Sequence, residues 1–178
     1  MSDLTRVCLL DKNVVRRAIT GMVKVQVGKR LSPEEDDALT LLWETRNEAL
    51  HPFITPETLN LLRRFTGRLE VDLFLEMVDV MHAGRYFKRW ARRLQEHGFT
   101  REDAKVLSLG TFGTRTAGDI LGADLIITLD QAFINNYQAQ LEALQERLGA
   151  MTVNLLPPFH KAVLPVFMQP AEALALLK

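Results

Sequence analysis

Two short, uninterrupted apolar runs stand out in the pattern of hydrophobic and polar positions, and each leads into an aspartate. Residues 7–10 (Val-Cys-Leu-Leu) precede Asp11, and residues 125–129 (Leu-Ile-Ile-Thr-Leu) precede Asp130. Runs of this kind are typical of strands that are buried on both faces of a parallel sheet. The carboxyl ends of such strands share one edge, where open α/β sheets bind ligands. If the two strands are neighbours, Asp11 and Asp130 face one crevice.

Start signals for helices separate the apolar runs. The segment 32–35 (Ser-Pro-Glu-Glu) has the form of a capping box, and 55–57 (Thr-Pro-Glu) pairs a cap residue with a proline. Asn13 is a further candidate cap, and Thr100 caps a helix whose first turn contains Asp103. The pattern predicts helices that begin near residues 14, 33, 56, 68, 86, 101, 136 and 170, and further strands at 53–54, 77–81 and 163–167.

Several details of these elements can be checked against a structure. The helix from residue 33 is expected to run to about Leu50, and His51-Pro52 is expected to end it. Pro165 would confine the last strand to a sheet edge. The segment from Gly110 to Gly118 has the composition of a loop, which could act as a lid. Two sets of residues are expected to face the core: Leu39, Leu42 and Trp43 in one helix, and Leu59, Leu62 and Phe65 in the next. Strands that alternate with helices predict a parallel-sheet α/β domain.

Composition narrows the class of protein. A chain of 178 residues suits a single domain, 1–178, and its 22 basic and 22 acidic residues produce no overall basic field. Cys8 is the single cysteine, which excludes an internal disulfide, and its place in a predicted strand indicates a small buried apolar role. No apolar run approaches transmembrane length and no signal peptide is visible, so a cytoplasmic protein without membrane contact is expected.

Acidic residues carry the candidate chemistry. The sequence has no dinucleotide-binding fingerprint, phosphate-binding loop or nucleophile elbow, and its four histidines lack metal-ligand spacing. Asp11, Asp103 and Asp130 at strand and helix ends would suit a Mg²⁺ or Mn²⁺ ion, which prefers carboxylate oxygens. A weaker alternative is phosphotransfer with Asp11 as the nucleophile, although Asn13 stands where the haloacid-dehalogenase pattern requires a second aspartate.

Several segments together resemble PIN domains. Residues 9–15 resemble the opening strand of that family, and residues 122–130 look like its late strand, which ends Thr-x-Asp. Asp103-Ala104 matches the third acid of the family, and 54–57 resembles its second strand and the helix after it. The tail at 169–174 is similar to the proline-started last helix of many members. The resemblance therefore spans the chain.

The resemblance implies a PIN-like three-layer α/β/α sandwich with a central, mostly parallel sheet, and a metal-dependent endoribonuclease. Asp11, Asp103 and Asp130 would be ligands of Mg²⁺ or Mn²⁺, or would orient water bound to it. Asn13 and Thr128 would brace these acids by hydrogen bonds. The expected partner is RNA. A toxin-type ribonuclease would add an antitoxin-like protein as a partner, and a homodimer is a further expectation.

One departure from the family separates two functional hypotheses. The position where the family usually places a glutamate is Leu61, while Glu57 lies one turn earlier on the same helical face and is a candidate substitute. Glu57 is equally explained as an acid favoured by the helix dipole. The alternative to a nuclease is therefore a catalytically degenerate PIN-fold module that binds nucleic acid or protein.

A basic run on one predicted helix has two interpretations. Lys88-Arg89 and Arg92-Arg93 would form either an ordinary solvated face or a surface that contacts RNA. Tyr86, Phe87 and Trp90 are interleaved with them but fall on the other face, where they are expected to pack in the core.

Overall fold

The two apolar runs are neighbouring parallel strands at the middle of one sheet. The computed structural model describes residues 5–47 and 49–177. In it, strand β1 (Arg6–Leu10) pairs with β6 (Leu125–Ile127), with Leu10 opposite Ile127. The five-stranded sheet has the order β3-β2-β1-β6-β7, and all its strand pairs are parallel. The chain builds outward from β1 on one side and then crosses to β6 on the other, so the boundary between β1 and β6 is a topological switch point.

The other strands differ in extent from the sequence prediction. Strand β2 (Leu50–Ile54) includes His51 and Pro52, so the prediction that these two residues only end a helix is wrong. Proline is tolerated there because β3 (Asp79–Val80) pairs only with Phe53 and Ile54, beyond Pro52. Strand β7 (Val166–Met168) lies at the sheet edge and begins directly after Pro165. The short strands β4 (His82–Ala83) and β5 (Gly113–Thr114) form a separate antiparallel pair.

Local capping rules fix most helix starts. Ser32 and Glu35 form the predicted capping box, and the Thr55 and Thr100 hydroxyls each accept a hydrogen bond from the third residue beyond them. The helices are α1 (Lys12–Gln26), α2 (Pro33–Glu44), α3 (Pro56–Leu62), α4 (Leu69–Met77), α5 (Phe87–Glu96), α6 (Arg101–Phe112), α7 (Gln131–Thr152) and α8 (Pro170–Leu176). Three 3₁₀ turns accompany them, η1 (Thr45–Asn47), η2 (Arg63–Phe65) and η3 (Phe159–Lys161).

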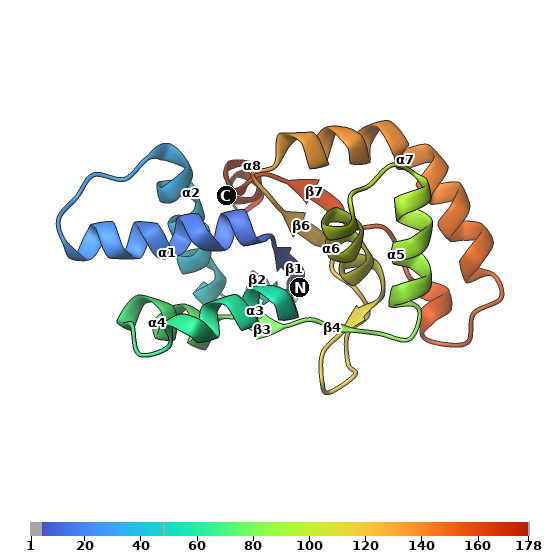
Figure 1. The fold of residues 1–178 in the computed structure, drawn as a ribbon, viewed down its shortest axis with the longest axis horizontal. Helices are drawn as coiled ribbons and strands as arrows, with labels where there is room; N and C mark the ends of the chain where they lie inside the picture. Colours follow the sequence, from blue (N-terminus) through green and yellow to red (C-terminus); the bar gives the residue numbers. More distant parts are fainter. Residues whose placement is uncertain (1–4, 48, 178) are drawn as a thin grey trace.

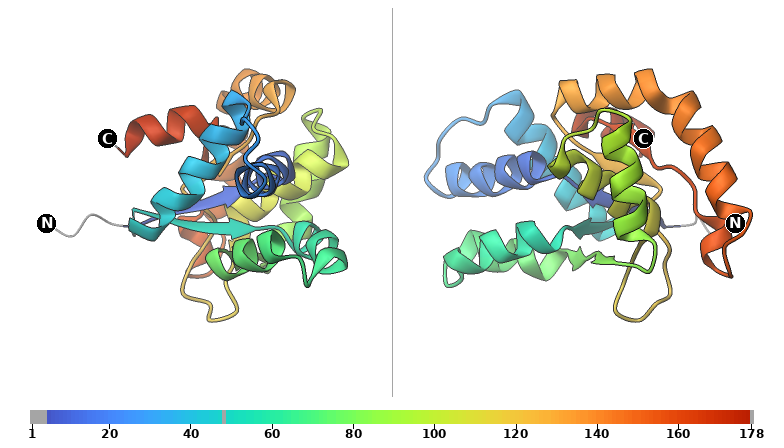
Figure 2. Two further views of the ribbon diagram at one scale, coloured as in Figure 1. Left: turned by 90° about the vertical axis from the view of Figure 1, so that its left-hand side faces the viewer. Right: turned by 45° about the vertical axis from the view of Figure 1, so that its right-hand side comes forward.

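Helices cover both faces of the sheet because the strand side chains alternate between two apolar cores. Leu9 and Ile126 point into the core formed with α5, α6 and α7, while Cys8 and Ile127 point into the core formed with α1, α2 and α8. The left view of Figure 2 shows α2 and α8 on one side of the sheet and α5 and α6 on the other, and Figure 1 labels these elements. The parallel-sheet α/β class predicted from the sequence is confirmed.

Several element boundaries and faces were predicted wrongly. Helix α2 ends at Glu44 instead of near Leu50, and α7 begins at Gln131 instead of near Asn136. Trp43 and Phe65 were expected in the core, but each is 45% exposed. The Arg46 guanidinium lies 4.2 Å from the centroid of the Trp43 ring, which covers part of this surface.

The segment predicted as a loop from Gly110 to Gly118 is only partly a loop. Residues 110–112 complete α6, and Gly113 and Thr114 form β5. Gly110 is required by packing, because a Cβ there would lie 2.7 Å from Cδ1 of Ile126 and 3.1 Å from Cγ of Pro165. The glycine therefore lets α6 approach the sheet closely, which its loop-like neighbours in the sequence conceal.

Within residues 5–47 and 49–177, no helix combines the length and the apolar character that crossing a membrane requires.

Candidate carboxylate site

Asp11 lies where β1 ends and α1 begins, and its side chain is almost fully buried. It is the N-cap of α1, with Oδ1 accepting from the Lys12 amide at 2.7 Å, so the prediction that Asn13 caps this helix is wrong. Its Oδ2 accepts from Thr128 Oγ1 at 2.7 Å and from Asn13 Nδ2 at 3.0 Å. Burial raises the pKa of Asp11, although these hydrogen bonds act in the opposite direction. The carboxylate is thus held by neutral donors alone.

Thr128 and Asn13 connect the ends of β1 and β6. The Asn13 side chain also accepts from the Leu129 amide at 3.1 Å, and Thr128 Oγ1 accepts from the Asp130 amide at 3.1 Å. Thr128 is fully buried. Because each of the two side chains contacts Asp11 and the backbone after β6, they fix the Asp11 carboxylate relative to the start of α7.

Asp130 and Asp103 reach the same edge from two other helix starts. Asp130 caps α7, with Oδ1 accepting from the Phe133 amide at 3.0 Å, and Asp103 lies in the first turn of α6. Burial is the largest cause of a raised pKa at Asp103, and the charges of Asp130 and Asp11 raise it further. Asp130 likewise raises the pKa of Asp11. The three carboxyl groups therefore lie near enough to repel one another.

The three acids are not gathered into a closed ligand cage. In the described part of the chain, no group of three or more His, Cys, Asp or Glu side chains lies in an arrangement that could hold a metal ion. The donor chemistry nevertheless fits a hard divalent cation, because the charge of Asp130 raises the pKa of Asp11 and Asp103, and all three acids present only oxygen atoms.

Two lysine–glutamate pairs flank the acids, and no sequence pattern indicates which residues would pair. Lys12, directly after Asp11, pairs with Glu102 of α6 instead of with the neighbouring aspartates. Lys105 Nζ of α6 lies 3.4 Å from Glu57 Oε1 of α3. Glu57, the candidate substitute acid, thus has a lysine partner and a side chain that is 61% exposed. The pairs join α1 and α3 to α6 across the outside of the site.

Leu61, the position at which PIN domains usually have a glutamate, lines an apolar groove. The groove has a volume of about 380 Å³ and lies between α1, α3 and α4. Leu61 is 49% exposed there, beside Phe65, and Lys12 is among the groove's lining residues. The groove therefore adjoins the residue that follows Asp11.

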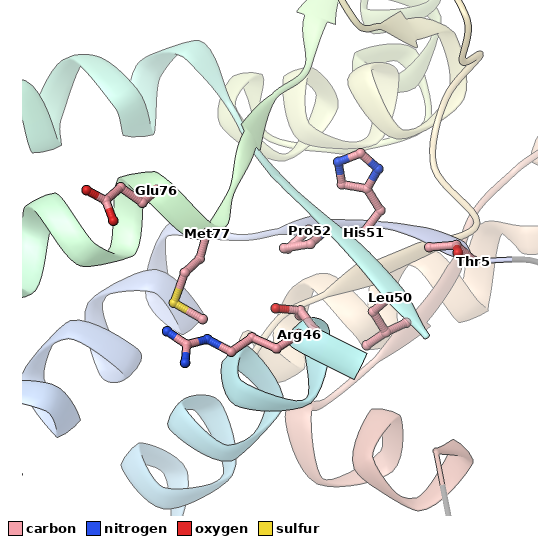
Figure 3. A pocket seen from close by; sticks show the side chains of 8 residues that line it. Thr5, Arg46, Leu50, His51, Pro52, Glu76 and Met77 are labelled. Atoms are coloured by element: carbon pink, nitrogen blue, oxygen red, sulfur yellow. The ribbon is translucent and has the colours of Figure 1, made fainter. Parts of the chain in front are cut away.

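A second pocket lies at the opposite edge of the sheet and contains none of the predicted acids. It has a volume of about 460 Å³ and is lined by residues at the starts of β1 and β2 and at the end of α4. Figure 3 shows the His51 ring on one side of β2 and the Arg46 and Met77 side chains on the other. His51 Nε2 is 2.7 Å from Asp79 Oδ2, so this histidine has a carboxylate partner within the sheet.

Cys8 is excluded as a nucleophile by its surroundings. Its side chain is fully buried in the predicted strand, and burial raises the pKa of its thiol to about 12. A thiolate is therefore not populated at neutral pH. The predicted role of Cys8 as a small core residue is confirmed.

Comparisons with protein-family models, curated proteins and solved structures find no match to this chain. The candidate function therefore depends on the sequence resemblance and on the geometry of Asp11, Asp103 and Asp130.

Proposed function

We propose that this chain is a PIN-like endoribonuclease that depends on Mg²⁺ or Mn²⁺ and hydrolyses phosphodiester bonds of RNA, as a toxin-type ribonuclease would. The observation that carries the proposal is Asp11, a buried carboxylate at a topological switch point whose hydrogen-bond donors among the described residues are all neutral. A structural carboxylate in this position would be expected to have a basic hydrogen-bond donor. Buried acids that have a raised pKa and lack such a donor are typical of functional sites.

In this proposal, Asp11, Asp103 and Asp130 would hold the cation. When bound, the cation would supply Lewis-acid chemistry, lowering the pKa of water and neutralising charge on the phosphodiester. Thr128 and Asn13 fix the position of the Asp11 carboxylate at the end of β1. Lys12 lies at the outer edge of the site, where its exposed ammonium group could exchange Glu102 for a substrate phosphate.

Cleavage of single-stranded RNA tests the proposal. Wild type, Asp11→Asn and Asp36→Asn are incubated with an RNA panel in Mg²⁺, Mn²⁺ or chelator. Asp36 is an exposed acid of α2 and undergoes the same chemical change, so it is a matched control. We expect cleavage by wild type and Asp36→Asn only with a cation, and a loss of about 100-fold or more in Asp11→Asn, exceeding the typical effect of residues that merely orient a ligand. Folded wild-type protein that cleaves no RNA in either cation would contradict the proposal.

A second candidate function is supported by Leu61 and its groove. A chain with a leucine in place of an acid, and an apolar groove with Phe65 45% exposed, would suit a catalytically degenerate module that binds protein or nucleic acid. An antitoxin-like protein or a second copy of the chain would then contact the groove. A stable complex that Leu61→Asp disrupts, together with the absence of cleavage, would favour this candidate over the nuclease.

A further inference from the structure

A row of exposed basic side chains without acidic partners follows the outer face of α5. The row, here called the α5 basic surface, consists of Arg85, Lys88, Arg89 and Arg92, with Arg85 just before the helix. None of the four has an ion pair with any residue in 5–47 or 49–177. Arg93, by contrast, pairs with Glu96 at 3.1 Å and is not part of the row. Like charges three and four residues apart on one helix face repel each other, so this row is unfavourable until an anion neutralises it.

The opposite face of α5 fixes the direction in which this row points. Trp90 and Leu94 are fully buried in the core shared with α6 and α7. The Trp90 indole donates to Thr111 Oγ1 of α6 at 3.2 Å. The helix therefore cannot rotate to bury its basic residues, and the α5 basic surface is ready for binding before any ligand arrives.

Residues from two other segments extend the positive charge at both ends of α5. The Phe159 ring of η3 packs edge-on against Tyr86, with centroids 5.1 Å apart, which brings the exposed Lys161 of η3 to the start of α5. At the other end, the exposed Arg101 opens α6, two residues before Asp103. Two acids near this end are already paired, Glu96 with Arg93 and Arg147, and Glu102 with Lys12, whereas Asp103 belongs to the carboxylate site.

We propose that the α5 basic surface binds the phosphodiester backbone of a nucleic acid and directs the strand toward Asp103, Asp11 and Asp130, an inference that rests on the proposed function. Within the helix, the residues from Lys88 to Arg92 span about 6 Å at 1.5 Å per residue, and Arg85 extends the row beyond its start. A nucleic acid backbone presents charges at closely spaced intervals over such a length, about one per 1.7 Å of duplex. The surface runs toward the site, because the end of α5 leads through residues 97–100 into the α6 turn that contains Asp103. The chain as a whole has a net charge of zero, so this attraction is local.

Fluorescence anisotropy in chelator tests this surface without requiring catalysis. Labelled single-stranded RNA and DNA of the same sequence are titrated with Asp11→Asn, which keeps the RNA intact. The test variant adds Arg89→Glu and Arg92→Glu. The control variant adds Arg63→Glu and Arg64→Glu, which reverses two exposed charges on η2, outside the α5 basic surface. Thermal melting checks that each variant is folded.

We expect the α5 double reversal to weaken RNA binding about 10-fold or more at low salt. Each lost phosphate contact should also reduce the slope of log K against log salt by about 0.7. The control variant with Arg63→Glu and Arg64→Glu should keep the RNA affinity and the salt slope of Asp11→Asn. Equal losses in the two double variants, or binding that does not depend on salt, would overturn the inference. So would the absence of RNA binding to Asp11→Asn combined with retention of the protein on anionic phospholipid vesicles.

The same RNA also separates this inference from the nuclease proposal. In the otherwise wild-type chain with Mn²⁺, RNA binding without cleavage would leave the α5 basic surface standing and overturn the nuclease. Cleavage by the wild type, together with an RNA affinity that Arg89→Glu and Arg92→Glu leave unchanged, would support the nuclease and overturn the role of the α5 basic surface.

Discussion

Asp11 and Glu35 are both nearly buried carboxylates, but their partners are opposite in character. Glu35 on α2 is 3% exposed and accepts from Lys24 Nζ at 2.7 Å and 2.8 Å and from the Ser32 amide at 2.8 Å. Arg17 Nη1 also lies 4.0 Å from Glu35 Oε1. Asp11 on the sheet edge is 8% exposed and accepts only from an amide, a hydroxyl and a side-chain carboxamide.

Their pKa values shift in opposite directions for this reason. The hydrogen bond from Lys24 is the largest cause of a lowered pKa at Glu35, whereas burial is the largest cause of a raised pKa at Asp11. The chain therefore gives one buried acid a basic hydrogen-bond donor, whereas the charge of Lys12 acts on the other only as a minor cause, after burial and two hydrogen bonds. An acid of the second kind is stabilised further when a cation binds to it from outside.

The largest expected effect is stabilisation of the wild type by a divalent cation. At a free Mn²⁺ concentration about 100 times Kd, binding should add about 2.7 kcal/mol to the free energy of unfolding. For a domain of this size, that corresponds to a rise in Tm of about 5 to 10 °C. Asp11→Asn should show almost none of this rise in Tm. Glu35→Gln should show the full rise, although its Tm without Mn²⁺ differs from that of the wild type. Scanning calorimetry with and without Mn²⁺ measures the difference, and an equal rise in all three proteins would remove the distinction between the two acids.

A smaller effect is expected from the hydroxyl that holds Asp11. Thr128→Val removes the donor to Asp11 and the acceptor of the Asp130 amide while nearly preserving the side-chain shape. We expect Mn²⁺ affinity to fall about 10-fold, the lower end of the range for residues that orient metal ligands. Thr128→Ser retains the hydroxyl and should restore most of the affinity. If isothermal titration calorimetry gives Thr128→Val and Thr128→Ser the same Mn²⁺ affinity, the hydroxyl does not position the carboxylate.

Without divalent cations, neutralising the two acids should move Tm in opposite directions by a few degrees. Asp11→Asn removes a buried charge and retains a residue type that caps helices well, so Tm should rise. Glu35→Gln leaves Lys24 without its carboxylate, so Tm should fall. Thermal melts at pH 7 in chelator measure both changes. A fall of similar size in both variants would show that Asp11 is stabilised by the fold in the same way as Glu35.

The smallest expected effect is in the pH dependence of stability without divalent cations. Glu35 has a lowered pKa, so its contribution is present above the unfolded value of about 4.3 and is lost as pH falls. Asp11 has a raised pKa, so the folded state holds the proton more tightly and stability falls as pH rises above about 3.9. Urea unfolding between pH 3 and 8 should show a shallower acid-side loss in Glu35→Gln and a shallower decline toward neutral pH in Asp11→Asn. Identical pH profiles for the two variants would contradict these assignments.

The sequence predicted those parts of the fold that depend on local patterns. The apolar runs before Asp11 and Asp130 identified β1 and β6, and the cap residues Ser32, Thr55 and Thr100 identified three helix starts. Boundaries that depend on distant contacts were not predicted. The continuation of α6 through Gly110 depends on its packing against Ile126 and Pro165, which no local rule encodes.

For the candidate site, too, local patterns selected the residues but not their partners. Asp11, Asp103 and Asp130 follow strand ends or open a helix, so position in the pattern was sufficient to select them. The sequence could not indicate that Lys12 pairs with Glu102 or that Lys105 pairs with Glu57, because these partners lie 90 and 48 residues apart. It also could not distinguish Glu35 from Asp11 as buried acids, since the difference lies in Lys24, a residue of another helix.

Direct Mn²⁺ binding tests the central claim, that Asp11, whose hydrogen-bond donors are all neutral, holds a divalent cation together with Asp103 and Asp130. The electron paramagnetic resonance signal of free Mn²⁺ is followed as wild type, Asp11→Asn, Asp103→Asn, Asp130→Asn and the control Asp36→Asn are titrated. The account predicts one saturable ion per chain in wild type and Asp36→Asn, loss of binding in Asp11→Asn, and weaker binding in Asp103→Asn and Asp130→Asn. Mn²⁺ binding that is unchanged by Asp11→Asn, or absent from the folded wild type, would contradict the account.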